Sequence, residues 1–257
     1  MSARFWAVLM PGLKPDSPWS LIQRDNPLSA SPPLWFTITA MSTRASRLPA
    51  EKRIKDILRI LKRAYPDARC SLNYSNPLQL LVATILSAQC TDERVNIVTQ
   101  TLFRKYPGAE DYAAASDEEM QNDIRTTGFF RNKTKSLKGA TKKIVEEYSG
   151  VVPHTMEELL TLPGVARKTA NVVLGNAFNI ASGVVVDTHV SRVSQRLALT
   201  KQKAPEKIEQ DLMNLVPKKQ WVKFGHQIIQ HGRYVCKALK PDCPNCPLSD
   251  LCPSAIL

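Results

Sequence analysis

The sequence predicts an all-α protein, and two observations carry that prediction. From Ala50 onward, apolar residues recur at helical spacing in one segment after another, and residues that start or end helices separate the segments. Only the run from Val184 to Val186 reads as extended, and it is too short to found a sheet. We therefore expect about ten short helices, with no internal sequence repeat.

The first three predicted helices follow from apolar spacing and from prolines. The first ends before Pro66, and its apolar stripe is formed by Ile54, Ile57, Leu58 and Leu61. Pro77 then opens a segment over 78–88 that is apolar on nearly every face, which is typical of a buried central helix. A third helix begins at Thr91 and ends before Pro107.

Capping signals start the later helices. Ser116 with Glu119, and Thr155 with Glu158, are capping-box patterns that each begin a helix. Between them, residues 133–148 carry one apolar stripe and are followed by a glycine that ends the helix. The last three predicted helices cover residues 188–197, 205–215 and 219–230.

The charge balance indicates a polyanionic partner. The chain of 257 residues has 35 Lys and Arg against 23 Asp and Glu, for a net charge of +12. Such an excess suits nucleic acid or an anionic membrane surface. No apolar run approaches the ~20 residues that a membrane span needs. Ten glycines and six cysteines exclude a collagen-like or disulfide-dense scaffold.

The first forty residues differ from the rest. They hold six of the 18 prolines and three of the four tryptophans, but almost none of the positive excess. Their apolar stretch is broken at Pro11 and does not resemble a signal peptide, and organellar targeting is disfavoured because no amphipathic helix is present. Residues 1–45 are interpreted as a disordered extension, or as a start assigned upstream of Met41.

Residues 162–171, LPGVARKTAN, predict a tight turn between two short helices spanning about 156–178. A glycine permits backbone conformations closed to other residues, and the next helix adds unpaired amides and a positive dipole end. Such a hairpin can cradle DNA phosphates without reading bases, although an ordinary helix connection has the same turn chemistry. The candidate contacts are Leu162, Gly164, Val165, Ala166 and Arg167.

Two residues near this hairpin suggest chemistry. Lys168 lies at the start of the outgoing helix, where the dipole and partial burial would favour the neutral amine that Schiff-base chemistry needs. Asp187 follows the apolar run at 184–186 and starts another helix. Asp is a favoured N-cap, so a structural role competes with a catalytic one there.

The C-terminal cysteines predict a metal site. The pattern C-x6-C-x2-C-x5-C places Cys236, Cys243, Cys246 and Cys252 on a proline-interrupted loop. Nothing marks the chain as secreted, so metal ligation is favoured over disulfides. Zinc sites more often show two CxxC pairs, so we favour a 4Fe-4S cluster, with zinc as the alternative. Cys70 and Cys90 are interpreted as buried small apolar residues.

Together these motifs resemble the endonuclease III family, helix-hairpin-helix DNA glycosylases and abasic-site lyases of base excision repair. The resemblance runs from about residue 47 to 252 and is carried by LPGVARKTANVV (162–173), VDTHV (186–190), SAQCTD (87–92), HGR (231–233) and the cysteine loop. It implies two helical lobes with a DNA cleft between them. A six-helix barrel containing the hairpin would span 70–180, and an iron-sulfur lobe would combine 46–69 with 181–257.

The resemblance also implies roles for individual residues. Lys168 and Asp187 match the family's catalytic lysine and aspartate, and Gln89 matches the side chain that fills the gap left by an extruded base. Phe129 would wedge the opposite strand, although simple packing is the alternative. Phosphate contacts from the basic loop would come from Arg233, Lys237 and Lys240. Ala166 stands where many members have a second hairpin glycine, and the positive φ that such a glycine allows would be strained for Ala.

The activity implied is that of a bifunctional enzyme. It would release oxidised pyrimidines from double-stranded DNA and cut 3′ to the abasic site by β-elimination, through a Schiff base on Lys168. A non-enzymatic DNA-binding iron-sulfur redox sensor and a monofunctional mismatch glycosylase are the alternatives. We expect a monomer with no membrane partner, associated with the nucleoid in a bacterial cytoplasm.

Overall fold

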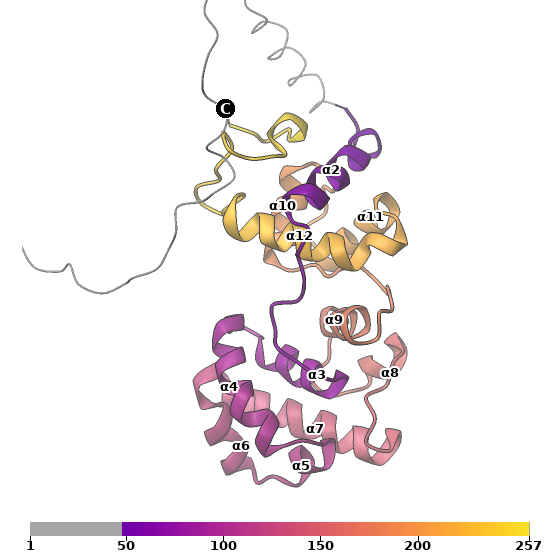
Figure 1. The fold of residues 1–257 in the computed structure, drawn as a ribbon. Helices are drawn as coiled ribbons and strands as arrows, with labels where there is room; N and C mark the ends of the chain where they lie inside the picture. Colours follow the sequence, from indigo (N-terminus) through magenta and orange to yellow (C-terminus); the bar gives the residue numbers. More distant parts are fainter. Residues whose placement is uncertain (1–47, 257) are drawn as a thin grey trace, which may run out of the picture.

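The computed structural model describes residues 48–256 and confirms the all-α class, since no strand occurs among these residues. Residues 1–45, for which the sequence predicts an extension, lie outside the described part. No helix within 48–256 is long and apolar enough to span a membrane. The helices form two groups, seen one above the other in Figure 1.

The first lobe is built around a helix that is buried on almost every face. This helix, α3 (Pro77–Leu86), has eight buried residues, and its N-cap Asn76 accepts a hydrogen bond from the Gln79 amide at 2.9 Å. Its neighbours are α4 (Asp92–Lys105), α5 (Ala109–Ala114), α6 (Asp117–Ile124), α7 (Phe130–Tyr148), α8 (Met156–Leu160) and α9 (Arg167–Ala177), with a 3₁₀ turn at Arg125–Thr127. One continuous apolar core joins them, with members from Leu72 to Leu174.

The second lobe joins the two ends of the described chain. It comprises α2 (Ala50–Ala64), α10 (Thr188–Arg196), α11 (Pro205–Leu215) and α12 (Trp221–Tyr234), with 3₁₀ turns at Lys218–Gln220 and Ser249–Leu251. Its separate core contains the apolar stripe of α2 and residues from Val184 to Leu251. Figure 1 shows α2 beside α10 and α12, and α9 on the side of the first lobe that faces the second.

The N-cap half of both predicted capping boxes is present. The side-chain oxygens of Ser116 and Thr155 accept hydrogen bonds from the amides of Glu119 and Glu158, at 3.1 and 3.2 Å. The residues at 184–186 run extended, as predicted, but they pair with no other strand among the described residues. Val184 and Val186 are buried in the second core. These two anchors determine where Asp187 begins α10.

The helix predictions miss one helix and misplace several helix boundaries. Helix α5 was not predicted, because it has six residues and buries only Ala109 and Tyr112, which is too short for a periodic signal. Helix α7 begins at Phe130 instead of 133, after a left-handed residue. The segment predicted at 219–230 is a 3₁₀ turn followed by α12, which continues to Tyr234.

A buried arginine ties the second lobe together. Arg53 on α2 is 2% exposed, and its guanidinium donates to the carbonyls of Leu48, Leu197 and Leu251 at 2.7–2.9 Å. These carbonyls belong to the start of the described chain, the end of α10 and the segment before the last cysteine. One side chain therefore joins three otherwise separate pieces of backbone.

We expect Arg53→Met to lower the free energy of unfolding by about 3 kcal/mol, because buried carbonyls lose a charged donor while the apolar stem is kept. Urea denaturation measures the change. The control is Arg59→Met on the same helix, whose partner Asp56 is exposed and whose loss should cost no more than about 0.5 kcal/mol. Equal unfolding midpoints for the two variants would contradict the assignment.

Candidate active site in the cleft between the lobes

A cavity of about 320 Å³ lies between the two lobes, and it contains both residues for which the sequence suggests chemistry. The first lobe contributes Gln89, Asp92 and Lys168 to its wall, and the second contributes Asp187, His226 and Arg233. Sequence spacing alone left open whether Lys168 and Asp187 meet. The fold brings them to one cavity from opposite lobes.

Lys168 is the second residue of α9 and follows the predicted hairpin turn. Gly164 has φ +77°, so it supplies the left-handed conformation that the turn requires. A Cβ at this position would also lie 2.4 Å from Cβ of Ser136 on α7. The turn is therefore packed directly on the first lobe, and this fixes the direction in which α9 starts.

Two expectations about the hairpin are wrong. Ala166 shows no strain, because it is the N-cap of α9 in extended backbone, with φ −94°, and Gly164 carries the turn. Lys168 is exposed at the cavity wall and is not partly buried, because the first turn of α9 projects into the cleft. The unpaired amides of that helix end remain next to it.

Asp187 is both a helix cap and part of the cavity wall. Its Oδ1 accepts a hydrogen bond from the Val190 amide at 2.8 Å, as an N-cap does. Its Oδ2 accepts no hydrogen bond from any described residue, and the side chain is half-buried. The structural role predicted for this residue is therefore present, and it leaves one carboxylate oxygen available to a ligand in the cavity.

An ion pair crosses the cleft beside Lys168. Arg233 on α12 donates to Oδ2 of Asp92 on α4 at 2.6 Å, and the Ser71 hydroxyl donates to the same oxygen. Burial alone would raise the pKa of Asp92, but these two hydrogen bonds and the charge of Lys168 outweigh it and hold that pKa below its ordinary value. Asp92 therefore stays ionised and joins the two lobes.

Sequence reasoning predicted Arg233 as a phosphate contact and missed Asp92. Arg233 is paired with Asp92 within the cleft. Of the three predicted phosphate contacts, Lys237 and Lys240 are exposed to solvent. Asp92 belongs to the SAQCTD segment, but an acid in the first turn of a helix is also an ordinary dipole partner. Its pairing with a residue 141 positions away has no local sequence signal.

The two predicted DNA-inserting side chains lie on left-handed backbone. Gln89 has φ 52°, is exposed and lines the cavity. Phe129 has φ 47°, follows a glycine with φ 72° and is 62% exposed, so it is not packed in the core. Behind it, the buried Lys133 donates to the Thr127 carbonyl at 2.8 Å and holds this turn in place.

The remaining hairpin residues present different groups. The side chains of Leu162 and Val165 are buried, so only their backbone can meet a ligand. Arg167, predicted to contact DNA, is bound instead to a carboxylate of the second lobe, Glu209, at 2.7 and 3.2 Å. No pattern in the sequence marks Glu209 as a functional residue.

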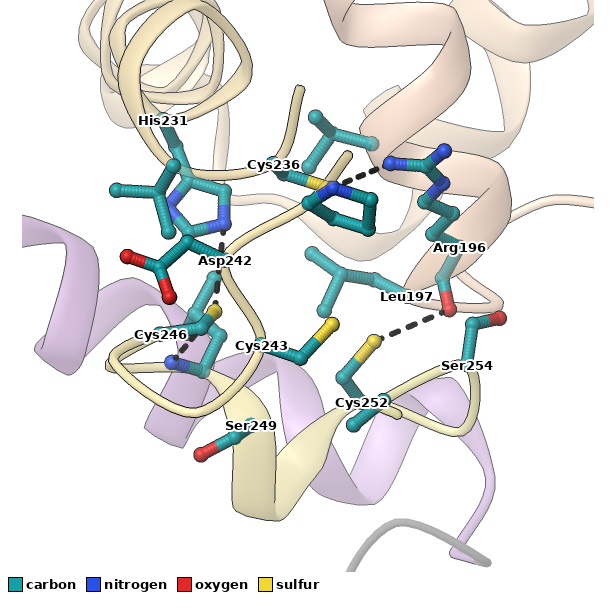
Figure 2. Close-up of a pocket in the computed structure, with 15 residues that line it drawn as sticks. Arg196, Leu197, His231, Cys236, Asp242, Cys243, Cys246, Ser249, Cys252 and Ser254 are labelled. Carbon is teal, nitrogen blue, oxygen red and sulfur yellow. Dashed lines mark hydrogen bonds between the residues drawn. The ribbon is translucent and has the colours of Figure 1, made fainter. Parts of the chain in front are cut away.

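The four C-terminal cysteines line one pocket between α10, the end of α12 and the last loop (Figure 2). Figure 2 shows the side chains of Cys243 and Cys252 pointing in the same direction. Arg196 donates to the Cys236 sulfur at 3.3 Å, and the Leu248 amide donates to the Cys246 sulfur at 3.4 Å. Within residues 48–256, no three His, Cys, Asp or Glu side chains converge on a point that would hold a single metal ion.

The Cys246 thiol is protonated when no metal is bound. Burial raises the pKa of Cys246 to about 11, and it lowers the pKa of the neighbouring His231 to about 4. The imidazole is therefore neutral, with Tyr65 hydrogen-bonded to Nδ1 at 2.8 Å and Nε2 3.6 Å from the Cys246 sulfur. Metal binding would release the proton from the Cys246 thiol.

Comparison with known proteins gives consistent results. The model of the HhH-GPD superfamily of base excision DNA repair proteins matches residues 82–218. The chain is 59% identical to endonuclease III of Synechocystis over 216 residues, covering 84% of this chain and 99% of that one. It is 40% identical to endonuclease III of Escherichia coli over 200 residues, covering 77% and 93%.

Solved structures match as well. A trapped endonuclease III–DNA covalent intermediate superposes with a TM-score of 0.77 at 43% identity, covering 81% of this chain and 98% of the other. A thermostable thymine-DNA glycosylase shares the fold, with a TM-score of 0.73 at 24% identity, covering 79% and 97%. The family model, the sequence identities and the shared fold agree: the chain belongs to the endonuclease III family of the HhH-GPD superfamily.

Proposed function

We propose that this protein is a bifunctional DNA glycosylase and abasic-site lyase that releases oxidised pyrimidines from double-stranded DNA. One observation carries the proposal. Lys168 and Asp187, on opposite lobes, line the same cavity in a chain of the endonuclease III family. A trapped covalent enzyme–DNA intermediate is known for a protein 43% identical to this one, and an attacking lysine accounts for such an intermediate.

The exposed amine of Lys168 suits attack on the sugar carbon that carries the base. Nζ bonds to C1′ as the C1′–N bond to the base breaks, and the base leaves with that electron pair. Oδ2 of Asp187 accepts the proton that the amine loses and stabilises positive charge on the opening sugar. The Nζ lone pair then forms a C1′=N double bond as the C1′–O4′ bond breaks and O4′ takes the proton held by Asp187. The resulting iminium acidifies C2′.

Strand cleavage follows from the iminium. Loss of a C2′ proton sends its electron pair into a C2′–C3′ double bond and expels the phosphate on the 3′ side, which is β-elimination. Hydrolysis of the iminium then returns the lysine. No oxidant or reductant is required in this sequence, and the groups needed in the cavity are an amine and a proton acceptor.

DNA binding would depend on groups that contact the phosphate backbone and do not recognise bases. The backbone amides around Gly164 and the first turn of α9 suit phosphate oxygens, and Lys237 and Lys240 add exposed positive charge. The base must leave the stack before C1′ is accessible. Gln89 would fill the gap at the cavity, and Phe129 would wedge the duplex from its exposed turn.

The cysteine pocket suits a 4Fe-4S cluster held by Cys236, Cys243, Cys246 and Cys252. The donor set supports this, because four cysteines share one pocket and the sulfurs of two of them, Cys236 and Cys246, accept hydrogen bonds. When bound, the cluster would crosslink the C-terminal loop to the lobe. The reaction described above uses no residue of this pocket.

The assembly and cellular setting complete the proposal. We infer that the protein acts as a monomer, because both proposed reacting residues come from one chain. We place it with the nucleoid in a bacterial cytoplasm, in keeping with its net charge of +12. The domain division is proposed as 70–180 for a barrel and 46–69 with 181–257 for a cluster lobe, following the two apolar cores.

Borohydride trapping tests the proposal directly. With double-stranded DNA carrying one oxidised pyrimidine, we expect reduction to give a covalent protein–DNA product, because hydride converts the iminium to a stable amine. Lys168→Ala should abolish this product, and Lys207→Ala, an exposed lysine of α11, should retain it. Undiminished trapping by Lys168→Ala would remove the lysine from its role.

Asp187→Asn separates the cap from the catalytic role. Asn caps helices as well as Asp does, so the thermal midpoint should stay close to wild type. Loss of the proton acceptor should slow single-turnover base release by about 10² to 10⁴-fold. Both are measured on the same preparations by thermal denaturation and quenched-flow cleavage. Wild-type turnover in this variant would leave Asp187 with the structural role alone.

Metal analysis tests the cysteine site. We expect about four iron atoms per chain with visible iron–sulfur absorbance, both lost in Cys246→Ser. Cys90→Ser, at a cysteine outside the pocket, should keep both. Stoichiometric zinc without iron in the wild-type protein would establish the alternative metal.

A further inference from the structure

A buried carboxylate on α11 contacts the first turn of the helix that bears Lys168. Glu209 is 5% exposed, although its helix belongs to the other lobe. Arg167 donates to both its oxygens, through Nε at 2.7 Å and Nη2 at 3.2 Å, and Asn171 donates to Oε1 at 2.8 Å. The ion pair is bidentate, and this fixes both the distance between Arg167 and Glu209 and their relative orientation.

These hydrogen bonds hold α9 at two residues on one face of the helix. Arg167 and Asn171 are four residues apart, so they lie one above the other on the same face of the helix. Lys168 is next to Arg167 and points from an adjacent face toward the cavity. The rotation and axial position of this helix end, set by Glu209, therefore determine where the Lys168 amine projects.

The same carboxylate contacts the chain segment that leads to Asp187. Gly183 passes so close that a Cβ there would lie 1.9 Å from Oε1 of Glu209, and under 3 Å from the side-chain amide of Asn171. Ser182 donates to Oδ1 of Asn171 at 2.8 Å. The backbone from 182 to 186 is thereby held against the network before it reaches the α10 N-cap.

Glu209 is not part of the cavity wall, so it does not touch a ligand there. Its position differs from that of a surface ion pair, because the carboxylate is buried between two segments. Its hydrogen-bond partners, Arg167 and Asn171, lie on α9, which bears Lys168, and its neighbour Gly183 lies on the segment that leads to Asp187. Removing it would leave Arg167 and Asn171 without their acceptor and would loosen both.

We propose that Glu209 is a positioning residue that sets the placement of Lys168 relative to Asp187, through Arg167 and Asn171 on one side and the Gly183 backbone on the other. The proposal rests on the glycosylase and lyase activity proposed above. Glu209 lies outside the cleft but would control the rate of the chemical step. A displacement of the reacting amine by about 1 Å is enough to lower that rate about 10²-fold.

The test is single-turnover cleavage of abasic-site DNA by Glu209→Gln, with the enzyme in excess. Gln keeps the shape of the side chain and one oxygen acceptor. It loses the negative charge and one of the two acceptors of the bidentate contact with Arg167. We expect the rate constant of the chemical step to fall by about 10²-fold, while the dissociation constant for the same DNA, measured with a reduced abasic-site analogue, changes less than about threefold.

A matched control lies two residues along the same helix. Asp211 accepts a hydrogen bond from Thr200 within the second lobe, away from the cavity. Asp211→Asn should lower the thermal midpoint but leave the rate constant of the folded enzyme unchanged. If Glu209→Gln behaves like Asp211→Asn, Glu209 has a structural role only and the proposal is overturned.

Two further variants keep the test decisive. Gly183→Ala places a methyl group against the intact carboxylate and should reduce the same rate constant without removing charge. Arg167→Ala combined with Glu209→Gln should be no slower than the slower single variant, because both act on one contact. Multiplied effects would overturn the route through Arg167. A wild-type enzyme that neither traps nor cleaves would instead overturn the activity itself.

Discussion

The placement of α9 at the boundary between two separate apolar cores is the constraint on which the candidate site depends. The chain crosses that boundary after α2 and again after α9. Because the second crossing lies between Lys168 and Asp187, the two side chains arise on opposite sides of the boundary and meet in the cleft. A single continuous core would have buried this surface, and the amine and carboxylate would then have lacked access to a ligand.

Polar contacts hold the boundary together. Asp92 pairs with Arg233, and Arg167 pairs with Glu209, each joining a first-lobe helix to a second-lobe helix. Contacts from α12 add to these, since Lys223 donates to two carbonyls of the 66–68 segment and His226 is hydrogen-bonded to Asn176. Such contacts are directional, so they fix the position of one lobe relative to the other. The cavity between the lobes stays open and polar.

The sequence is informative where the physical signal is local. Caps at Ser116 and Thr155, the buried character of α3 and the left-handed Gly164 depend on residues within a few positions, and each is present as predicted. Asp92 and Glu209 depend on partners 141 and 42 positions away, which no local pattern specifies. The prediction of strain at Ala166 is wrong because a hairpin needs one left-handed residue, and Gly164 already supplies it.

Asp187 illustrates why a capping residue is well suited to a reactive position. An N-cap side chain is held by its own backbone through one oxygen, so its orientation costs little additional entropy when a ligand arrives. The hydrogen bond to Oδ1 also fixes the orientation of Oδ2, because both oxygens belong to one planar carboxylate. The buried Val184 and Val186 fix the backbone just before it, and the close passage at Gly183 ties that backbone to Glu209. The structural role of Asp187 and the catalytic role proposed for it are therefore compatible, because the cap supplies the rigidity that a preorganised proton acceptor requires.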